Sequence, residues 1–211
     1  FRRMDEQFIN PVDNTSDSGA NGPSFLGSRD PLPPVFWGQE SGLTCLDHVV
    51  SEVWQSGYTH HINRLMVLAN WATLLDVNPQ ALSDWFWVGF IDAYDWVVEP
   101  NVIGMGAYAV GDYMTTKPYI SGSAYLNKMS DYCSDCPLGH NSSCPMTPMY
   151  WSFLNRHRPQ LTGNPRLSLV LGSAAKRDAQ KCDRDRRVTH LVKHTLANGH
   201  LVTPELMAGV G

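Results

Sequence analysis

The sequence has no long hydrophobic run and no repeated unit. Its longest apolar stretch, from about Trp85 to Ile91, is far shorter than the ~20 residues that a membrane-spanning helix needs. An integral membrane protein is therefore excluded, and so are a collagen and a coiled coil, which need sustained repeats. Hydrophobic residues make up 43% of the 211 residues and charged residues 17%, which is typical of a chain that folds around a sizeable core.

Convincing alternating strand patterns are also missing, whereas apolar residues recur at helical spacing along most of the chain. Asn78 is expected to cap a helix that has Pro79 at its first position, and Thr147 is expected to cap a later one. Pro100 is expected to end a central helix, and the Gly-rich stretch 101–121 to be irregular. We predict an all-α bundle with helices over about 46–57, 59–75, 79–97, 122–132, 147–157 and 174–197.

Charge is distributed unevenly along the chain. Residues 1–145 carry 6 Lys and Arg against 16 Asp and Glu, whereas residues 146–211 carry 10 against 4. The acidic first part argues against a dedicated DNA-binding protein. The basic helix from Lys176 to Arg187 suits an acidic partner or an anionic lipid surface, although a solvated helix face explains it equally well.

The five cysteines do not have the spacing of a small disulfide-rich domain. Three form the pattern Cys133-x2-Cys136-x7-Cys144, while Cys45 lies far upstream and Cys182 far downstream. A cluster of this kind in a larger chain indicates a metal site first and disulfides second. Four thiolates suit either zinc or an iron–sulfur cube, and the spacing alone leaves both open.

Several motifs occur together in a recognisable order. They are residues 57–67, which include His60 and His61; residues 92–97, followed by Pro100 and Asn101; 117–119; 129–136; and 150–158. In this order the motifs resemble the iron–sulfur bacterial cryptochromes and photolyases over about residues 37–166.

The resemblance implies an all-helical, flavin-binding half of such a protein, with a [4Fe–4S] cluster on Cys45, Cys133, Cys136 and Cys144. Cys182 matches nothing in the family. In relatives that repair (6-4) lesions, the histidine at the position of His61 is the acid that protonates the lesion. His60 directly precedes it in the sequence. The resemblance also suggests Trp37 and Trp85 as electron-transfer aromatics and Asn101 as a flavin-binding residue, although packing roles explain the two histidines and the two tryptophans as well.

Departures from the family pattern bear on function. Where the family has Trp-Val-Glu-Leu-Pro-Asn near the flavin ring, this chain has Val98 before Glu99, so the carboxylate has moved one place along. Residues 106–112 differ too, and Phe86 stands where relatives often have Tyr. Because Val98 cannot accept a hydrogen bond from a reduced flavin, weak or absent FAD binding is expected.

Two functional hypotheses follow. In the first, the chain is a photolyase-derived [4Fe–4S] protein that has lost DNA repair and serves as a structural or binding subunit of a larger assembly of an organellar, photosynthetic or respiratory kind. In the second, it is part of an active FAD-dependent (6-4) photolyase or cryptochrome, and DNA is then its partner. Few residues precede Trp37, and the chain begins with Phe1. A processed form, or only part of something longer, is therefore expected; taken as the whole protein, the chain would lack the antenna domain and part of the flavin pocket.

The expected organisation has three parts: an irregular extension over 1–34, a photolyase-like iron–sulfur domain over 35–170 and a divergent basic helical tail over 171–211. The many large aromatic residues predict a bare apolar surface and hence a hetero-complex, with the extension lying along a neighbour. Peripheral membrane contact is compatible with the basic tail. An organellar or cytoplasmic location is expected, not secretion.

Overall fold

The computed structural model describes residues 24–210. Every regular element within these residues is a helix, apart from one isolated β-bridge between Asp30 and Val77. The predicted all-α class is therefore confirmed. The elements are η1 (Pro34–Trp37), α2 (Thr44–Ser56), α3 (His61–Asn63), η2 (Arg64–Ala69), α4 (Asn70–Leu74), α5 (Pro79–Gly89), α6 (Asp95–Val98), η3 (Glu99–Gly106), η4 (Gly111–Tyr113), α7 (Ser123–Met129), η5 (Gly139–Ser143), α8 (Met146–Arg156), α9 (Arg158–Leu161), α10 (Ser168–Ala175), α11 (Ala179–Ala197) and α12 (Pro204–Ala208).

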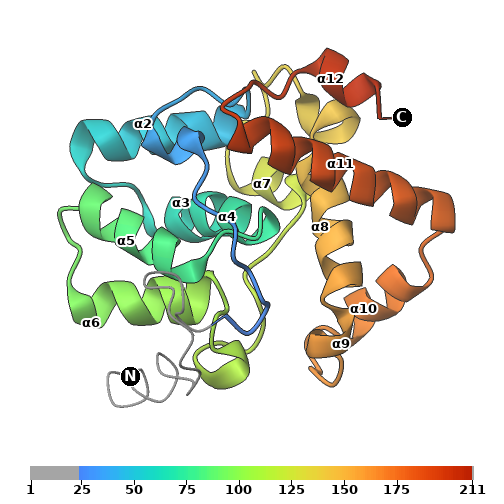
Figure 1. Ribbon diagram of the computed structural model, residues 1–211, viewed down its shortest axis with the longest axis horizontal. Coiled ribbons are helices and arrows are strands. Elements are labelled where there is room, and N and C mark those ends of the chain that lie inside the picture. Colours follow the sequence, from blue (N-terminus) through green and yellow to red (C-terminus); the bar gives the residue numbers. More distant parts are fainter. Residues whose placement is uncertain (1–23, 211) are drawn as a thin grey trace, which may run out of the picture.

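The helices form two groups, with α2 to α6 on one side and α8 to α11 on the other (Figure 1). The two groups share one core, in which α4 contacts α8 and α11 packs along α8. The largest fully buried side chains include Trp71 and Trp85 from the first group and Met146 and Phe153 from the second. No helix within residues 24–210 is long and apolar enough to cross a membrane.

Helix ends follow the sequence signals in two of three cases. The Asn78 side chain accepts hydrogen bonds from the backbone amides of Gln80 and Ala81, and Pro79 begins α5, as predicted. Gly57 ends α2 with a left-handed φ of 67°. The predicted cap at Thr147 is wrong, because α8 begins earlier, at Met146, and the Thr147 hydroxyl instead accepts from the Ser123 amide at 3.1 Å.

The single helix predicted over 79–97 is also wrong. α5 ends at Gly89, and α6 begins only at Asp95. Phe90 turns inward instead of continuing the helix, and its ring stacks on Phe86 at 4.8 Å. Trp96, predicted to face inward, is consequently 77% exposed.

Pro100 does not end a helix, contrary to the prediction. It lies within one continuous helical run, because α6 passes directly into η3, a π-helix whose second residue is Pro100; this run therefore lacks one amide donor. Part of the stretch predicted to be irregular, up to Gly106, is therefore helical, and Val102 and Ile103 are buried within it. The predicted helix over 174–197 is divided as well, since Asp178 caps α11 separately from α10.

The predicted extension over 1–34 is described only from residue 24 onward; residues 1–23 lie outside the described residues. The described part crosses the molecule between the two helix groups (Figure 1). Its backbone is attached at both ends, because the Phe25 amide donates to the Ala109 carbonyl at 2.8 Å and the Asn78 amide donates to the Asp30 carbonyl at 2.8 Å.

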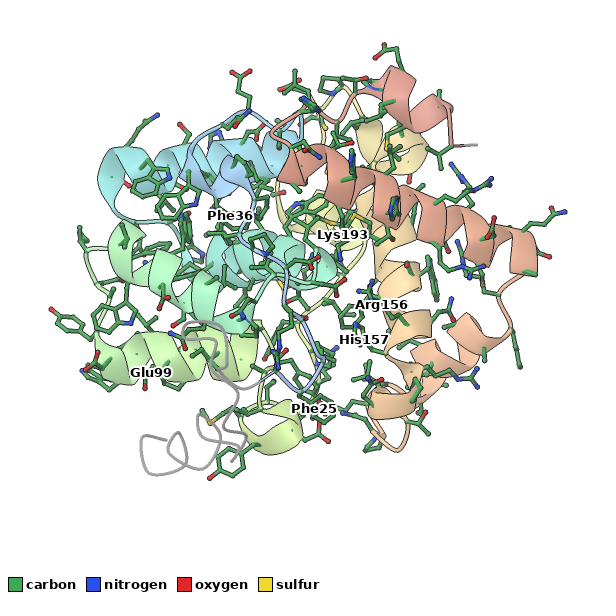
Figure 2. All side chains as sticks on the ribbon, in the orientation of Figure 1. Phe25, Phe36, Glu99, Arg156, His157 and Lys193 are labelled. Atoms are coloured by element: carbon green, nitrogen blue, oxygen red, sulfur yellow. The ribbon has the colours of Figure 1, made fainter. Side chains whose placement is uncertain are left out.

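A partly buried ionic cluster fastens this segment to both helix groups. Asp76 accepts from Arg156 of α8 at 2.6 Å and from Lys193 of α11 at 2.7 Å, and Lys193 also pairs with Asp30 at 2.7 Å. Figure 2 shows Arg156, His157 and Lys193 in the region where the two groups meet. Burial alone would raise the pKa of Asp76, but its contacts with His157, Arg156 and Lys193 together hold that pKa below its usual value.

Candidate metal centre and the His61 pocket

Four cysteines from distant parts of the chain line one small cavity. Cys45 is the second residue of α2, Cys133 and Cys136 lie in the turns after α7, and Cys144 directly follows η5. The cavity walls are otherwise mostly apolar and aromatic. The other lining residues are Leu43, Thr44, Trp71, Ser123, Leu126, Tyr132, Leu138 and His140.

The environment of these thiols disfavours free thiolates. The pKa of Cys45 is raised to about 12 and that of Cys144 to about 11. Burial is the main cause in both cases, and the neighbouring cysteines contribute to each rise. The pKa of Cys133 is also raised, by burial and by Cys136. Because metal ligation needs thiolates, a bound cationic group would have to supply the charge that stabilises them.

The donor set fits a metal group of the iron–sulfur kind. All five cysteines are free of disulfides, and the four that line the cavity are the number that a [4Fe–4S] cube takes. Within residues 24–210, no three His, Cys, Asp or Glu side chains converge closely enough to hold a single metal ion. The structure thus brings the four predicted ligands to one cavity without the tight convergence of a one-ion site.

One hydrogen-bond donor to these thiols was not anticipated from the sequence. The indole Nε1–H of Trp71 donates to Cys45 Sγ at 3.4 Å. This contact acts to lower the pKa of Cys45, against the effect of burial. Trp71 is 26 residues from Cys45, so only the folded chain reveals this pairing.

A second cavity, of about 130 Å³, opens where α3 and η2 meet α6 and η3. His61, Val98 and Asn101, which the sequence analysis singled out, all line it. Its volume is below the ~300 Å³ at which ligand pockets usually begin. The remaining lining residues are Arg64, Leu65, Ala69, Phe86, Phe90, Asp92, Ala93, Val97 and Val102.

Arg64 is the cationic residue that lines this His61 pocket together with Asp92, and sequence analysis did not select it. Its guanidinium forms two hydrogen bonds with the Asp92 carboxylate, at 3.0 and 2.9 Å. The same group lies over the Phe90 ring, with 4.2 Å from Cζ to the ring centroid, and near the Tyr58 ring at 5.0 Å. Arg64 is thus held in one orientation by both contacts.

The other positions that the sequence analysis singled out near this pocket have different surroundings. His60 does not line the pocket; its Nδ1 accepts from the Ile62 amide at 3.2 Å and caps α3. Val98 is buried in the pocket wall, where it offers no hydrogen-bond acceptor, and Glu99 is not among the lining residues. The side chain of Asn101 donates to the Val97 carbonyl at 2.7 Å.

Aromatic rings connect the surface to this pocket. Trp37 is 56% exposed and stacks on Trp54 at 5.8 Å, and Trp54 meets Trp85 edge-on at 6.2 Å. Trp85 in turn contacts Phe86 and Phe90, which line the pocket. The structure therefore joins the two predicted tryptophans through Trp54. Both Trp54 and Trp85 also donate their indole N–H to the Phe36 carbonyl, at 2.9 and 2.7 Å, so each has a packing role.

Comparison with known proteins identifies relatives of part of this chain. It is 40% identical over 151 residues to a (6-4) photolyase of Agrobacterium fabrum, an alignment that covers 69% of this chain and 30% of the photolyase. It is also 40% identical over 70 residues to an uncharacterised protein of Acanthamoeba polyphaga mimivirus, covering 33% of this chain and 57% of that protein. No protein-family model matches the chain. The chain thus spans about 30% of the length of the photolyase, and over that part the similarity supports a relationship to the photolyase and cryptochrome family.

Proposed function

We propose that this chain is a photolyase-derived iron–sulfur module that holds a [4Fe–4S] cluster on Cys45, Cys133, Cys136 and Cys144. The observation that carries the proposal is the gathering of these four free thiols around one largely apolar cavity. The similarity to a (6-4) photolyase is consistent with it. A bound cluster supplies the positive charge that keeps buried thiolates ionised.

Zinc is the competing occupant, because four thiolates suit a zinc ion as well as an iron–sulfur cube. Pro145, directly after Cys144, and the resemblance of the ordered motifs to the iron–sulfur photolyases favour the cluster. The mainly apolar walls also exclude water, which protects a cluster from hydrolysis.

The role that we propose for the centre is structural. Cys45 fixes the first turn of α2, while Cys133, Cys136 and Cys144 fix the irregular segment between α7 and α8. This segment has little regular structure of its own, and four ligand bonds would order it. The module would then serve as a structural or binding subunit of a larger assembly, without a repair activity of its own.

Iron and labile-sulfide analysis of anaerobically purified protein tests this proposal. We expect four irons and four sulfides per chain, together with the broad absorbance near 400 nm of a cubane. Stoichiometric zinc without sulfide would contradict the cluster. Repair of (6-4) lesions by the isolated chain would contradict the loss of repair while leaving the cluster in place.

The His61 pocket favours a second candidate, part of a flavin-dependent (6-4) photolyase. His61, Arg64 and Asn101 line the same cavity, and an aromatic path leads from it to the surface. In this hypothesis His61 donates a proton to the lesion, while Arg64 orients neighbouring groups through its fixed guanidinium. FAD titration and light-dependent repair of a (6-4) oligonucleotide test it, with His61→Ala as the catalytic variant and His60→Ala as its matched control.

A further inference from the structure

A large cavity of the described chain lies away from both candidate sites. It has a volume of about 870 Å³ and is bounded by segment 30–34 on one side and by α8 and α11 on the other. This volume is within the ~300–1,000 Å³ of small-molecule pockets. We call this cavity the α8–α11 groove. None of the four clustered cysteines and no residue of the His61 pocket lines it.

The floor of the groove is apolar, and three buried side chains form much of it. Pro33 and Val77 come from the segments beside the bridge, and Leu196 comes from α11. Ser152 and Asn155 of α8 add polar groups. A floor of this kind holds an apolar body and fixes its orientation through a few polar contacts.

Basic side chains outnumber acidic ones along the groove. Arg186, His190 and His194 follow one another at intervals of four residues along α11, so they lie on one face of that helix. Arg156 of α8 lines the groove too, and the carboxylate among the lining residues, Asp30, is paired with Lys193 at 2.7 Å. Within residues 24–210, neither imidazole has a hydrogen-bond or ion-pair partner, so both are available to a ligand.

Existing ion pairs leave one cation of the rim largely uncommitted. Arg156 and Lys193 are engaged with Asp76. Among the described residues Arg186 pairs with Asp183 alone, at 3.0 Å, and both side chains are more than half exposed, so the pair is weak. Asp183 also pairs with Arg187 at 3.5 Å, so its charge is shared between two arginines. Arg186 can therefore turn to an anion at the groove opening with little loss.

From these features we propose that the α8–α11 groove binds a small amphipathic organic anion, with its apolar body against Pro33, Val77 and Leu196 and its anionic group at Arg186. His190 and His194 would donate hydrogen bonds to the same anionic group. The free thiol of Cys182 also lines the groove, where its sulfur accepts a hydrogen bond from the side-chain amide of Asn155 at 3.5 Å. A thiol-specific reagent can therefore report whether a ligand covers this part of the groove.

Two fluorescent probes of similar shape test the proposal on the full chain. 1-Anilinonaphthalene-8-sulfonate is an aromatic anion, and N-phenyl-1-naphthylamine is its uncharged counterpart. We expect Arg186→Glu to weaken sulfonate binding about 5- to 10-fold, as expected for a charge-assisted contact at a partly exposed site. Binding of the uncharged probe should change less than twofold. Arg184→Glu, on an exposed position of the same helix outside the groove, is the matched control and should leave both affinities unchanged.

A second measurement locates the bound probe and does not depend on that variant. The sulfonate should slow iodoacetamide modification of Cys182 at least threefold, measured on the Cys182 peptide by mass spectrometry. Ala197→Trp, at an exposed lining position, should block the groove and remove this protection. The proposal is overturned if Cys182 is not protected, or if Arg186→Glu and Arg184→Glu affect sulfonate binding equally.

Discussion

The cysteine cavity and the His61 pocket are assembled in different ways. The cysteines come from residues 45 to 144, and the Trp71 donor comes from a third region between them. The His61 pocket, in contrast, is lined entirely by residues 61 to 102. The lining of the first cavity therefore depends on contacts between segments far apart in the sequence, whereas the lining of the second depends on how a local group of helices packs.

The two cavities also differ in how closely they keep the expected chemistry. All four expected metal ligands line the first. In the second, Val98 replaces a carboxylate, and the Arg64 charge is already satisfied by Asp92. The first cavity presents four thiols whose ionised form a bound metal group would stabilise, whereas the arginine of the second is already paired with a carboxylate. This contrast leads us to expect firm metal binding and weak flavin binding.

Cys45→Ser should have the largest effect. Because the free energy of metal binding is also folding free energy, we expect loss of iron together with loss of cooperative unfolding. Cys182→Ser, outside the cavity, is the matched control and should keep full iron content with a stability change of less than about 1 kcal/mol. Thermal denaturation followed by circular dichroism, combined with iron analysis, measures both. Full iron in a stable Cys45→Ser protein would remove the distinction between the two cavities.

Asp76→Asn should lower stability by about 2–4 kcal/mol at pH 7, because Arg156 and Lys193 lose a partly buried partner. Asn tolerates the left-handed φ of 59° at this position, so the variant removes charge without adding strain. It should leave the iron content unchanged, since neither cavity contains Asp76.

The pH dependence of that loss follows from the lowered pKa of Asp76. The carboxylate stabilises the fold above its unfolded value of 3.8, and this contribution disappears as pH falls through the lower folded value. The stability difference between wild type and Asp76→Asn, from urea denaturation, should thus be constant from pH 7 to about pH 5 and shrink below it. A difference that grows on acidification would contradict this assignment.

Trp85→Phe should cost about 2 kcal/mol, because a buried indole loses volume and its hydrogen bond to the Phe36 carbonyl. Trp37→Phe, at the exposed end of the same aromatic path, should change stability by less than about 0.5 kcal/mol. If both tryptophans serve only in packing, neither variant alters photoreduction of added FAD. Slower photoreduction in Trp37→Phe would instead favour the flavin hypothesis.

Val98→Glu should have the smallest effect, a tightening of FAD binding by about 3- to 10-fold, as expected for one added hydrogen bond to a charged group offset by burial of the carboxylate. Val88→Glu is the matched control, because Val88 is 65% exposed and lies outside the pocket. Fluorescence quenching of FAD measures both affinities. Tight, stoichiometric FAD in the wild type would show that Val98 does not limit binding.

Local signals in the sequence correctly predicted the class of fold and several helix ends. Helical spacing of apolar residues identified α2 and most of α11, and Asn78-Pro79 marked the start of α5. These features depend on residues within a few positions of each other, which is why periodicity and capping rules suffice. The cysteine spacing selected three of the four cysteines that line one cavity, and the family resemblance added Cys45; the metal stays a prediction.

Tertiary structure decided the features that depend on distant contacts. The break at Phe90 arises from packing on Phe86 and from the pairing of Asp92 with Arg64, 28 residues away. The indole contact of Trp71 with Cys45 and the α8–α11 groove similarly join segments that are far apart in sequence. Helix propensity is worth less than about 1 kcal/mol per residue, so burial of an aromatic ring or pairing of a partly buried charge overrides it, and neither can be located before the chain is folded.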